Sequence, residues 1–409
     1  MEKKGLLSWV VSICFLIIIA SVSEVAICAP VSEAPKTIKI GGAISATGAF
    51  AGPAGHVRDG YEFAVADINE AGGVFVKQFN KKIPLELIVY DDESNPAKTV
   101  SRLERLHSEE NVTAYLGGFS SVLAVPGCAI GEKNKVPWLG IAFSAEAPHR
   151  QGYTYVFSPY PKSRDYVKSF EIYKHLPESQ WPRKAAIFER DEDWGKEMAD
   201  VFENSGKQHG FTVAMRKKFS PGTKDFTPHI MAAKAAGADM VLDVSTTPEG
   251  MAMMKQMKEL DYNPKWVYMV RAGNSDQWVN FSEGNYVTTV PGWHNSLPFP
   301  MVDKINARSR AKYGKNAAFE SGSAYSCVQI IADGITLAGT LDRKGIRDAI
   351  AKTNMMTAIG PIKFLPDGTA DFEYIVIVQI QDGKAECVNP HKYRSASFVY
   401  PFPKWKERK

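Results

Sequence analysis

Three serines stand where an apolar run gives way to a loop. Ser120 and Ser121 follow the apolar run Val112–Leu116 in the segment GGFSS, and Ser144 follows the apolar run Val136–Ala142. Serine hydroxyls and the free N–H groups at the start of a helix both hydrogen-bond to anions. The spacing therefore predicts a binding site for a carboxylate. The alternative at each position is a serine that only caps a helix.

The same serines lack the sequence surroundings of a catalytic nucleophile. The segment Gly118-Phe119-Ser120-Ser121 has no closing glycine and no motif-placed histidine. The chain has no HExxH or Walker A motif, and the loop from Gly48 to Gly55 lacks the GxGxxG fingerprint. The sequence thus predicts a protein that is not an enzyme and holds no cofactor. A secreted serine hydrolase that uses Ser120 or Ser121 is the catalytic alternative.

No metal site is predicted from the cysteines. Three of them lie outside the N-terminal segment, far apart and without metal-ligand spacing: Cys128, Cys327 and Cys387. We expect free or buried thiols.

These loops need strands and helices to position them, and the clearest unit spans Ile38 to Gly73. Residues Ile38–Ile44 are almost all apolar and predict a buried strand, and a turn-rich loop follows. Apolar residues then recur at helical spacing from Val57 to Ile68, and two glycines end the helix. Ligands bind at the carboxyl ends of the strands in open α/β sheets, so this is the expected binding edge.

Strand and helix patterns go on alternating along the chain. One series of strand–helix units precedes residue 157, and a second series begins at Lys184. This alternation predicts parallel sheets with helices on both faces. The predicted fold class is α/β, with two doubly wound parallel-sheet lobes that the last part of the chain completes by crossing back and forth.

The composition is that of a globular protein. The 409 residues are 44% hydrophobic and 23% charged, and the net charge is +4. Lys and Arg are scattered rather than clustered, so no nucleic-acid partner is predicted.

The N-terminus predicts a secretory signal peptide. Lys3 and Lys4 precede the apolar run Leu6–Ala20 and a stretch of small residues. We assign residues 1–29 to the signal and expect a periplasmic location. Lipidation of Cys28 and an uncleaved membrane anchor are the alternatives.

The chain resembles the periplasmic leucine/isoleucine/valine-binding protein family in GGAISATGAFAGPAGHVRDGYEFAVADINEAGGV, VYDDESNPAKTV and YLGGFSSVLAVPGCAIGEKNKVPWLGIAFSA. The resemblance continues through AIFERDEDWGKEMADVFENSGKQHGFTV and GPIKFLPDGTADFEY and covers nearly all of the expected mature chain. Members of this family are the substrate-binding components of branched-chain amino acid type ABC importers. The resemblance therefore implies a small-molecule ligand and a membrane permease as partners.

The resemblance also implies a type I periplasmic-binding fold. Two lobes are joined by three crossovers, and the ligand sits between lobes that close around it. The implied segments are a first lobe at 36–157, a second lobe at 158–287, completion of the first lobe at 288–355 and completion of the second at 356–400. The basic residues at 401–409 predict a loose surface tail.

Site residues follow from the resemblance position by position. Ser120 and Ser121 match the loop that holds the ligand carboxylate, and Ser144 and Ala145 match the second loop of that lobe. Across the cleft, Ser245 and Thr246 stand where the family's amino-acid binders place an aromatic residue.

One position departs from the family's amino-acid binders. They carry an acid that pairs with the α-ammonium group, and our alignment puts Ala272 there, with Arg271 beside it. Loss of a charge-assisted partner costs the ammonium about 1.5–3 kcal/mol. An arginine instead favours a second acidic group or a carboxylate without an amine. A solvated Arg271 on the surface is the alternative.

Other residues on the expected cleft loops extend the candidate site. Three acids are candidates to replace the missing one: Glu146, Glu189 and Glu249. Four aromatic residues either line an apolar pocket or pack in the core: Phe119, Phe143, Trp194 and Trp293.

The sequence favours a solute-binding protein of an ABC importer. By resemblance the default ligand is a hydrophobic or branched-chain amino acid, and an aromatic or aliphatic carboxylic acid is the competitor. A ligand-sensing receptor module is a further alternative.

Overall fold

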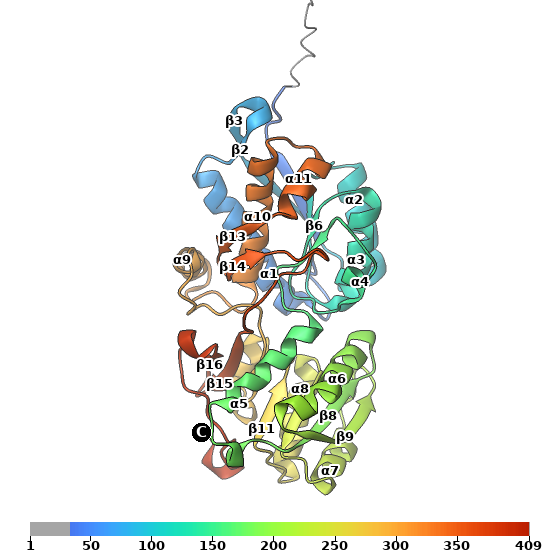
Figure 1. The fold of residues 1–409 in the computed structure, drawn as a ribbon, viewed down its shortest axis with the longest axis vertical. Coiled ribbons are helices and arrows are strands. Elements are labelled where there is room, and N and C mark those ends of the chain that lie inside the picture. Colours follow the sequence, from blue (N-terminus) through green and yellow to red (C-terminus); the bar gives the residue numbers. More distant parts are fainter. Residues whose placement is uncertain (1–32, 409) are drawn as a thin grey trace, which may run out of the picture. The chain divides into compact units, whose positions relative to one another are not determined.

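The computed structural model describes residues 33–408. The expected signal peptide at 1–29, with Cys28, lies outside these residues. From Ala34 onward the chain forms one compact unit. This unit contains two large β-sheets (Figure 1).

The first sheet is wholly parallel, in the order β4-β1-β5-β6-β7. Its strands are β1 (Ile38–Ala43), β4 (Leu85–Tyr90), β5 (Ala114–Leu116), β6 (Trp138–Leu139) and β7 (Val156–Phe157). A short hairpin of β2 (Val74–Val76) and β3 (Lys81–Ile83) stands beside it.

Helices cover both faces of the first sheet (Figure 1). One core joins β1 to α1 (Ala51–Glu70), α10 (Ser321–Ala338) and α11 (Arg343–Ile350), and α9 (Val302–Tyr313) packs beside them. A smaller core lies against α2 (Pro96–Ser108) and α3 (Ser121–Asn134). Asn95 caps α2, because its side chain accepts N–H bonds from Ala97 and Lys98. The doubly wound arrangement expected from the alternating pattern is therefore present.

The second sheet runs β16-β15-β12-β11-β10-β8-β9, parallel except at β15 and β16. Its strands are β8 (Lys184–Arg190), β9 (Thr212–Phe219), β10 (Met240–Asp243), β11 (Trp266–Met269), β12 (Thr288–Thr289), β15 (Ile377–Gln381) and β16 (Lys384–Asn389). It shares one core with helices α5 (Glu171–Lys174), α6 (Asp193–Ser205), α7 (Thr227–Ala235) and α8 (Thr247–Glu259).

Three segments carry the chain between the sheets, and two boundaries differ from expectation. The expected return to the first lobe at 288 is too early, because β12 still pairs with β11 and β15. The expected departure at 356 is also too early, since the hairpin of β13 (Asn354–Thr357) and β14 (Gly360–Lys363) belongs to the first core. Phe364 explains this placement, because its ring packs 5.3 Å from that of Phe157.

The first crossing segment, between β7 and β8, and the third, between β14 and β15, are tied to each other. Ser158 forms an isolated bridge with Thr369, whose hydroxyl also accepts a 2.8 Å bond from Arg164. The fully buried Lys162 donates to the Phe143 carbonyl and to the Ser158 hydroxyl, each at 2.8 Å. Burial lowers the pKa of Lys162 to about 7. These contacts make the two segments one structural unit.

The C-terminal segment is not the loose tail that its basic residues suggest. Phe402 is buried and its N–H donates to the Lys265 carbonyl, and the Trp405 indole donates to the Tyr262 carbonyl. The Arg408 guanidinium lies 3.6 Å from the centre of the Trp405 ring. Aromatic side chains between the basic ones supply the apolar area that holds the segment on the second lobe.

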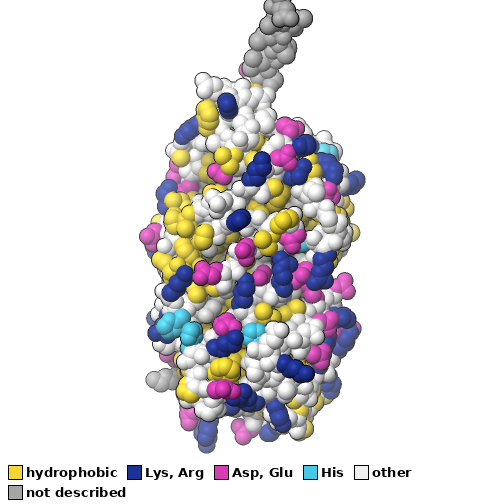
Figure 2. All heavy atoms as spheres, viewed as in Figure 1, with side chains coloured by type: hydrophobic (Ala, Val, Ile, Leu, Met, Phe, Trp, Pro, Cys, Tyr) yellow, Lys and Arg dark blue, Asp and Glu magenta, His cyan; other side chains and the backbone are white. Residues whose placement is uncertain are grey.

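On the face shown in Figure 2, basic and acidic side chains of the described residues are interspersed, and neither charge forms a large patch. Cys128, Cys327 and Cys387 are free and buried, as expected.

Among residues 33–408 no single helix is long and apolar enough to span a membrane. The pair α10 and α11 meets the length and composition together, but it is bent by 114°.

Substitution of Gly60 should destabilise the first lobe. A Cβ at Gly60 would lie 2.2 Å from the Ser321 carbonyl oxygen and 2.6 Å from the Ala324 Cβ, so α1 could no longer approach α10. We expect Gly60→Val to cost at least about 1–3 kcal/mol in urea unfolding followed by circular dichroism. Gly52→Ala, on the same helix with open space around the new Cβ, is the control and should be neutral or stabilising. Equal midpoints for the two variants would contradict this account of the packing.

Candidate functional site

A small recess lies where the carboxyl ends of strands from both sheets meet. We call it the inner recess, and it is lined by Phe119, Ser120, Ser121, Ala142, Ser144, Tyr160, Tyr166, Trp194, Val270, Arg271 and Asn274. Its free volume is about 20 Å³, which is room for roughly one water molecule. The polar groups therefore converge within contact distance of anything that enters.

A larger space adjoins it. We call this the outer cavity, and it has a volume of about 570 Å³. Its walls come from segments 48–53, 222–224, 246–252 and 274–277, with Phe119, Arg190 and Arg271. Phe119, Arg271 and Asn274 line both spaces, so the outer cavity leads to the inner recess.

The Ser121 hydroxyl has a fixed role among its neighbours. Its oxygen accepts the N–H groups of Ser144 at 3.2 Å and Ala145 at 3.3 Å. Two accepted bonds occupy both lone pairs of a hydroxyl oxygen, so its proton is left to be donated. Ser121 also starts helix α3, whose first N–H groups have no intrahelical partner. The site thus presents donors to an anion.

Two backbone outliers lie beside Ser121. Ser120 has φ of +88° and Ala142 has φ of +57°, both in the left-handed region that favours glycine. The Ser120 N–H donates to the Ala142 carbonyl at 3.0 Å, which holds the two loops together. The buried Ser120 hydroxyl has no partner within residues 33–408. Strained non-glycine residues cluster at binding sites, where the strain preorganises polar groups.

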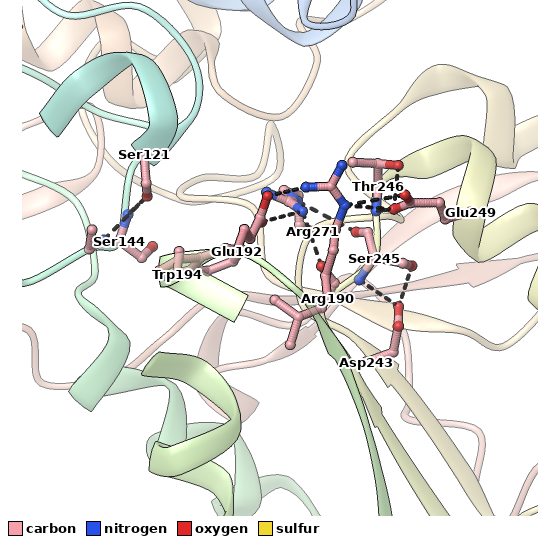
Figure 3. A network of polar contacts seen from close by, with 12 residues as sticks. Ser121, Ser144, Arg190, Glu192, Trp194, Asp243, Ser245, Thr246, Glu249 and Arg271 are labelled. Carbon is pink, nitrogen blue, oxygen red and sulfur yellow. Dashed lines mark hydrogen bonds and ion pairs between the residues drawn. The ribbon is translucent and has the colours of Figure 1, made fainter. Parts of the chain in front are cut away.

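Arg271 supplies a positive charge from the second sheet (Figure 3). Its Nη2 lies 2.9 Å from Glu192 Oε1 in an ion pair and donates to the Val244 carbonyl at 3.0 Å. The guanidinium also lies 5.0 Å from the centre of the Trp194 ring. Only 11% of the Arg271 side chain is exposed. The alternative of a solvated surface arginine is therefore wrong.

The three candidate replacement acids are already engaged. Glu249 pairs with Arg190 at 3.0 Å and caps α8 by accepting from Thr246 (Figure 3). Burial tends to raise the pKa of Glu249, but these N–H and hydroxyl bonds and Arg190 lower it overall. Glu146 pairs with Arg150 and Arg164, and Glu189 pairs with Arg216. Of the described residues that line the inner recess, Arg271 alone carries a charge.

The predicted site residues are only partly brought together. Phe119, Ser120, Ser121, Ser144, Trp194 and Arg271 line the inner recess, and Thr246 lines the outer cavity. Four others lie away from both spaces for identifiable reasons. Ala145 packs in the second core, and Ser245 turns its hydroxyl to Asp243. Glu146 faces its two arginines, and the fully buried Trp293 donates to the Ala358 carbonyl.

Some lining residues were not predicted. Tyr160 and Tyr166 reach the inner recess from the first crossing segment, and Asn274 reaches it from the loop after β11. Asn274 could have been found, since it ends the RAGN segment that follows the apolar run WVYMV. Glu192 and Arg190 were missed as partners of the charge cluster. Within residues 33–408 no group of histidines, cysteines and acids could hold a metal ion.

Asp243 is a further acid behind the site. It is fully buried at the end of β10, and its Oδ2 accepts the N–H and hydroxyl of Ser245. Burial raises its pKa to about 7. Asp243 is thus protonated below neutral pH and adds no negative charge to the recess there.

The fold and the site are those of a solute-binding protein with a cleft between two α/β lobes. The periplasmic binding protein family matches residues 37–385, and the chain belongs to this family. A relative from Pseudomonas aeruginosa, the leucine-, isoleucine-, valine-, threonine- and alanine-binding protein, is 27% identical over 84% of this chain and 90% of its own. The Leu/Ile/Val-binding protein homolog 7 of Brucella suis is 24% identical over 90% and 96%.

Solved structures share the fold. The branched-chain amino acid transporter substrate-binding protein of Streptococcus pneumoniae, in complex with isoleucine, superposes with a TM-score of 0.74 at 21% identity, covering 90% of this chain and all of its own. A solute-binding protein of R. palustris in complex with benzoate superposes at 0.73 and 16% identity, covering 89% and 97%. At these identities the likeness shows a shared fold.

Replacement of Asp243 should change how stability depends on pH. A carboxyl whose pKa is raised in the folded state stabilises the fold below its unfolded pKa of about 4 and loses that contribution as pH rises towards 7. Asn carries no such dependence. Relative to wild type, Asp243→Asn should therefore gain on the order of a few kcal/mol in free energy of unfolding between pH 4 and pH 7.5.

Denaturant unfolding at several pH values measures this difference. Asp382→Asn, in the exposed turn between β15 and β16, is the control. Parallel pH profiles for Asp243→Asn and wild type would show that Asp243 is ionised throughout.

Proposed function

We propose that this protein binds small monocarboxylates with an apolar body, aromatic or aliphatic, between its two lobes for uptake by an ABC importer. The observation that carries this proposal is the charge of the inner recess. Serine hydroxyls and a helix start face an arginine there, and the described lining contains no acid. Such a site compensates a carboxylate and leaves an α-ammonium group without a partner.

Closure of the lobes would follow from the placement of these groups. Ser121 starts the helix after β5 and Ser144 follows β6, both beside the first sheet, whereas Arg271 follows β11 of the second. A carboxylate that reaches both sides gains all its bonds only when the lobes are together. Ligand then shifts the population towards the closed form, which a permease can recognise.

A hydrophobic amino acid is the second candidate. It is supported by what the printed names say the relatives bind, and by isoleucine in the complex of similar fold. For this ligand Glu192 or Glu249 would have to leave its arginine and turn towards the ammonium group. Each acid would then exchange one charge-assisted pair for another, with little net gain.

The remaining parts of the proposal rest on the family and on the signal segment. We infer a periplasmic location, a permease partner and binding without catalysis. The Ser120 and Ser121 hydroxyls have no histidine among the residues that line the described recess, so neither has a general base. A receptor role would use the same ligand site.

Titration calorimetry with matched ligand pairs tests the proposed function. The protein is first unfolded mildly and refolded to remove bound solute, then titrated with leucine, phenylalanine and their deaminated acids 4-methylpentanoate and 3-phenylpropanoate. We expect the deaminated acids to bind and the amino acids to bind at least about 10-fold more weakly, because their ammonium group is left unpaired. Binding of the amino acids alone would refute the proposal and establish the second candidate.

Arg271 should contribute strongly to the affinity for these acids. Arg271→Gln removes a charge-assisted partner worth about 1.5–3 kcal/mol, so we expect the dissociation constant to rise by roughly 10- to 150-fold. Arg183→Gln, an exposed arginine that lines neither space, is the control. An unchanged affinity in Arg271→Gln would remove Arg271 from the site.

A further inference from the structure

The free space of the site is distributed unevenly. The inner recess, which holds the anion-binding groups, offers about 20 Å³, and the adjoining outer cavity offers about 570 Å³. For scale, a cavity of roughly 150 Å³ holds one benzene molecule. The outer cavity therefore exceeds what a single ring or a leucine side chain fills.

Apolar groups form part of the outer wall, beside the charged side chains of Arg190, Lys224, Glu249 and Arg271. Phe50 and Phe119 contact each other, with ring centres 6.1 Å apart, and Phe119 reaches both spaces. Pro53 on α1 and Ala252 on α8 extend the apolar wall, one from each lobe. Gly52 lines the same cavity, and a Cβ placed on it would meet no atom within 4 Å. Apolar groups from both lobes therefore line this cavity.

We propose that the preferred solutes are carboxylates with a long apolar body, which anchor the carboxylate in the inner recess and extend past Phe119 into the outer cavity. This inference rests on the proposed function, since it uses the same carboxylate anchor. It goes further by placing the apolar body of the ligand in the outer cavity. It also makes Gly52 a position that determines which ligand lengths bind.

A chain-length series on the wild-type protein tests the proposal directly. The probes are the straight-chain acids from butanoate to nonanoate, measured by titration calorimetry. Each methylene that is buried should tighten binding about three- to four-fold, so nonanoate should bind on the order of 100-fold more tightly than pentanoate. Affinity that levels off or falls beyond about five carbons would overturn the proposal.

Two glycine variants on one helix locate the effect. Gly52→Phe fills the outer cavity, and Gly55→Phe is the matched control, because its Cβ is equally free of contacts while Gly55 lies outside the cavity lining. We expect Gly52→Phe to weaken nonanoate by at least about 10-fold while butanoate keeps its affinity, and Gly55→Phe to leave both unchanged. Equal effects of Gly52→Phe on short and long acids would overturn the proposal.

The outcomes separate this inference from the proposed function. If short acids bind but length has no effect, the carboxylate anchor stands and the assignment of the outer cavity falls. If no acid of the series binds and amino acids do, both fall together. The wild-type series decides the question even if the Gly52→Phe protein fails to fold.

Discussion

The hydrogen bonding of the Ser121 hydroxyl is the constraint on which the site depends. Its oxygen accepts two backbone N–H groups from the loop after β6, so the proton has to be donated elsewhere. This fixes Ser121 as a donor and ties the loops after β5 and β6 to each other. The left-handed backbone of Ser120 and Ala142 is the conformational cost of bringing these loops so close.

The second lobe contributes the positive charge of Arg271, whose position is fixed by contacts within the protein. Arg271 is held by Glu192, by the Val244 carbonyl and by the face of Trp194. Arg190 in turn holds Glu192 and Glu249, so the acids of this wall are neutralised within the protein. A preorganised donor set costs little reorganisation on binding, which favours an anionic ligand over a zwitterion.

Much of the fold could be predicted from the sequence because strands and helices alternate with clear periodicity. GGFSS and RAG could be placed at the sheet edges, since loops after parallel strands share one edge. Tyr160 and Tyr166 could not, because their position depends on the path of a crossing segment. Trp293 was predicted to line the cleft because it lies in a loop segment. Whether such a residue packs in the core or lines a pocket depends on tertiary packing, which the sequence pattern does not show.

The most direct test of the account is a crystal structure of the complex with a bromine-labelled long-chain carboxylate, located by anomalous scattering. The account predicts the carboxylate within hydrogen-bonding distance of the Ser121 hydroxyl and the Arg271 guanidinium, with the bromine atom in the outer cavity beside Phe50 and Phe119. A carboxylate bound elsewhere in the cleft, with Ser121 and Arg271 keeping only their present partners, would contradict it.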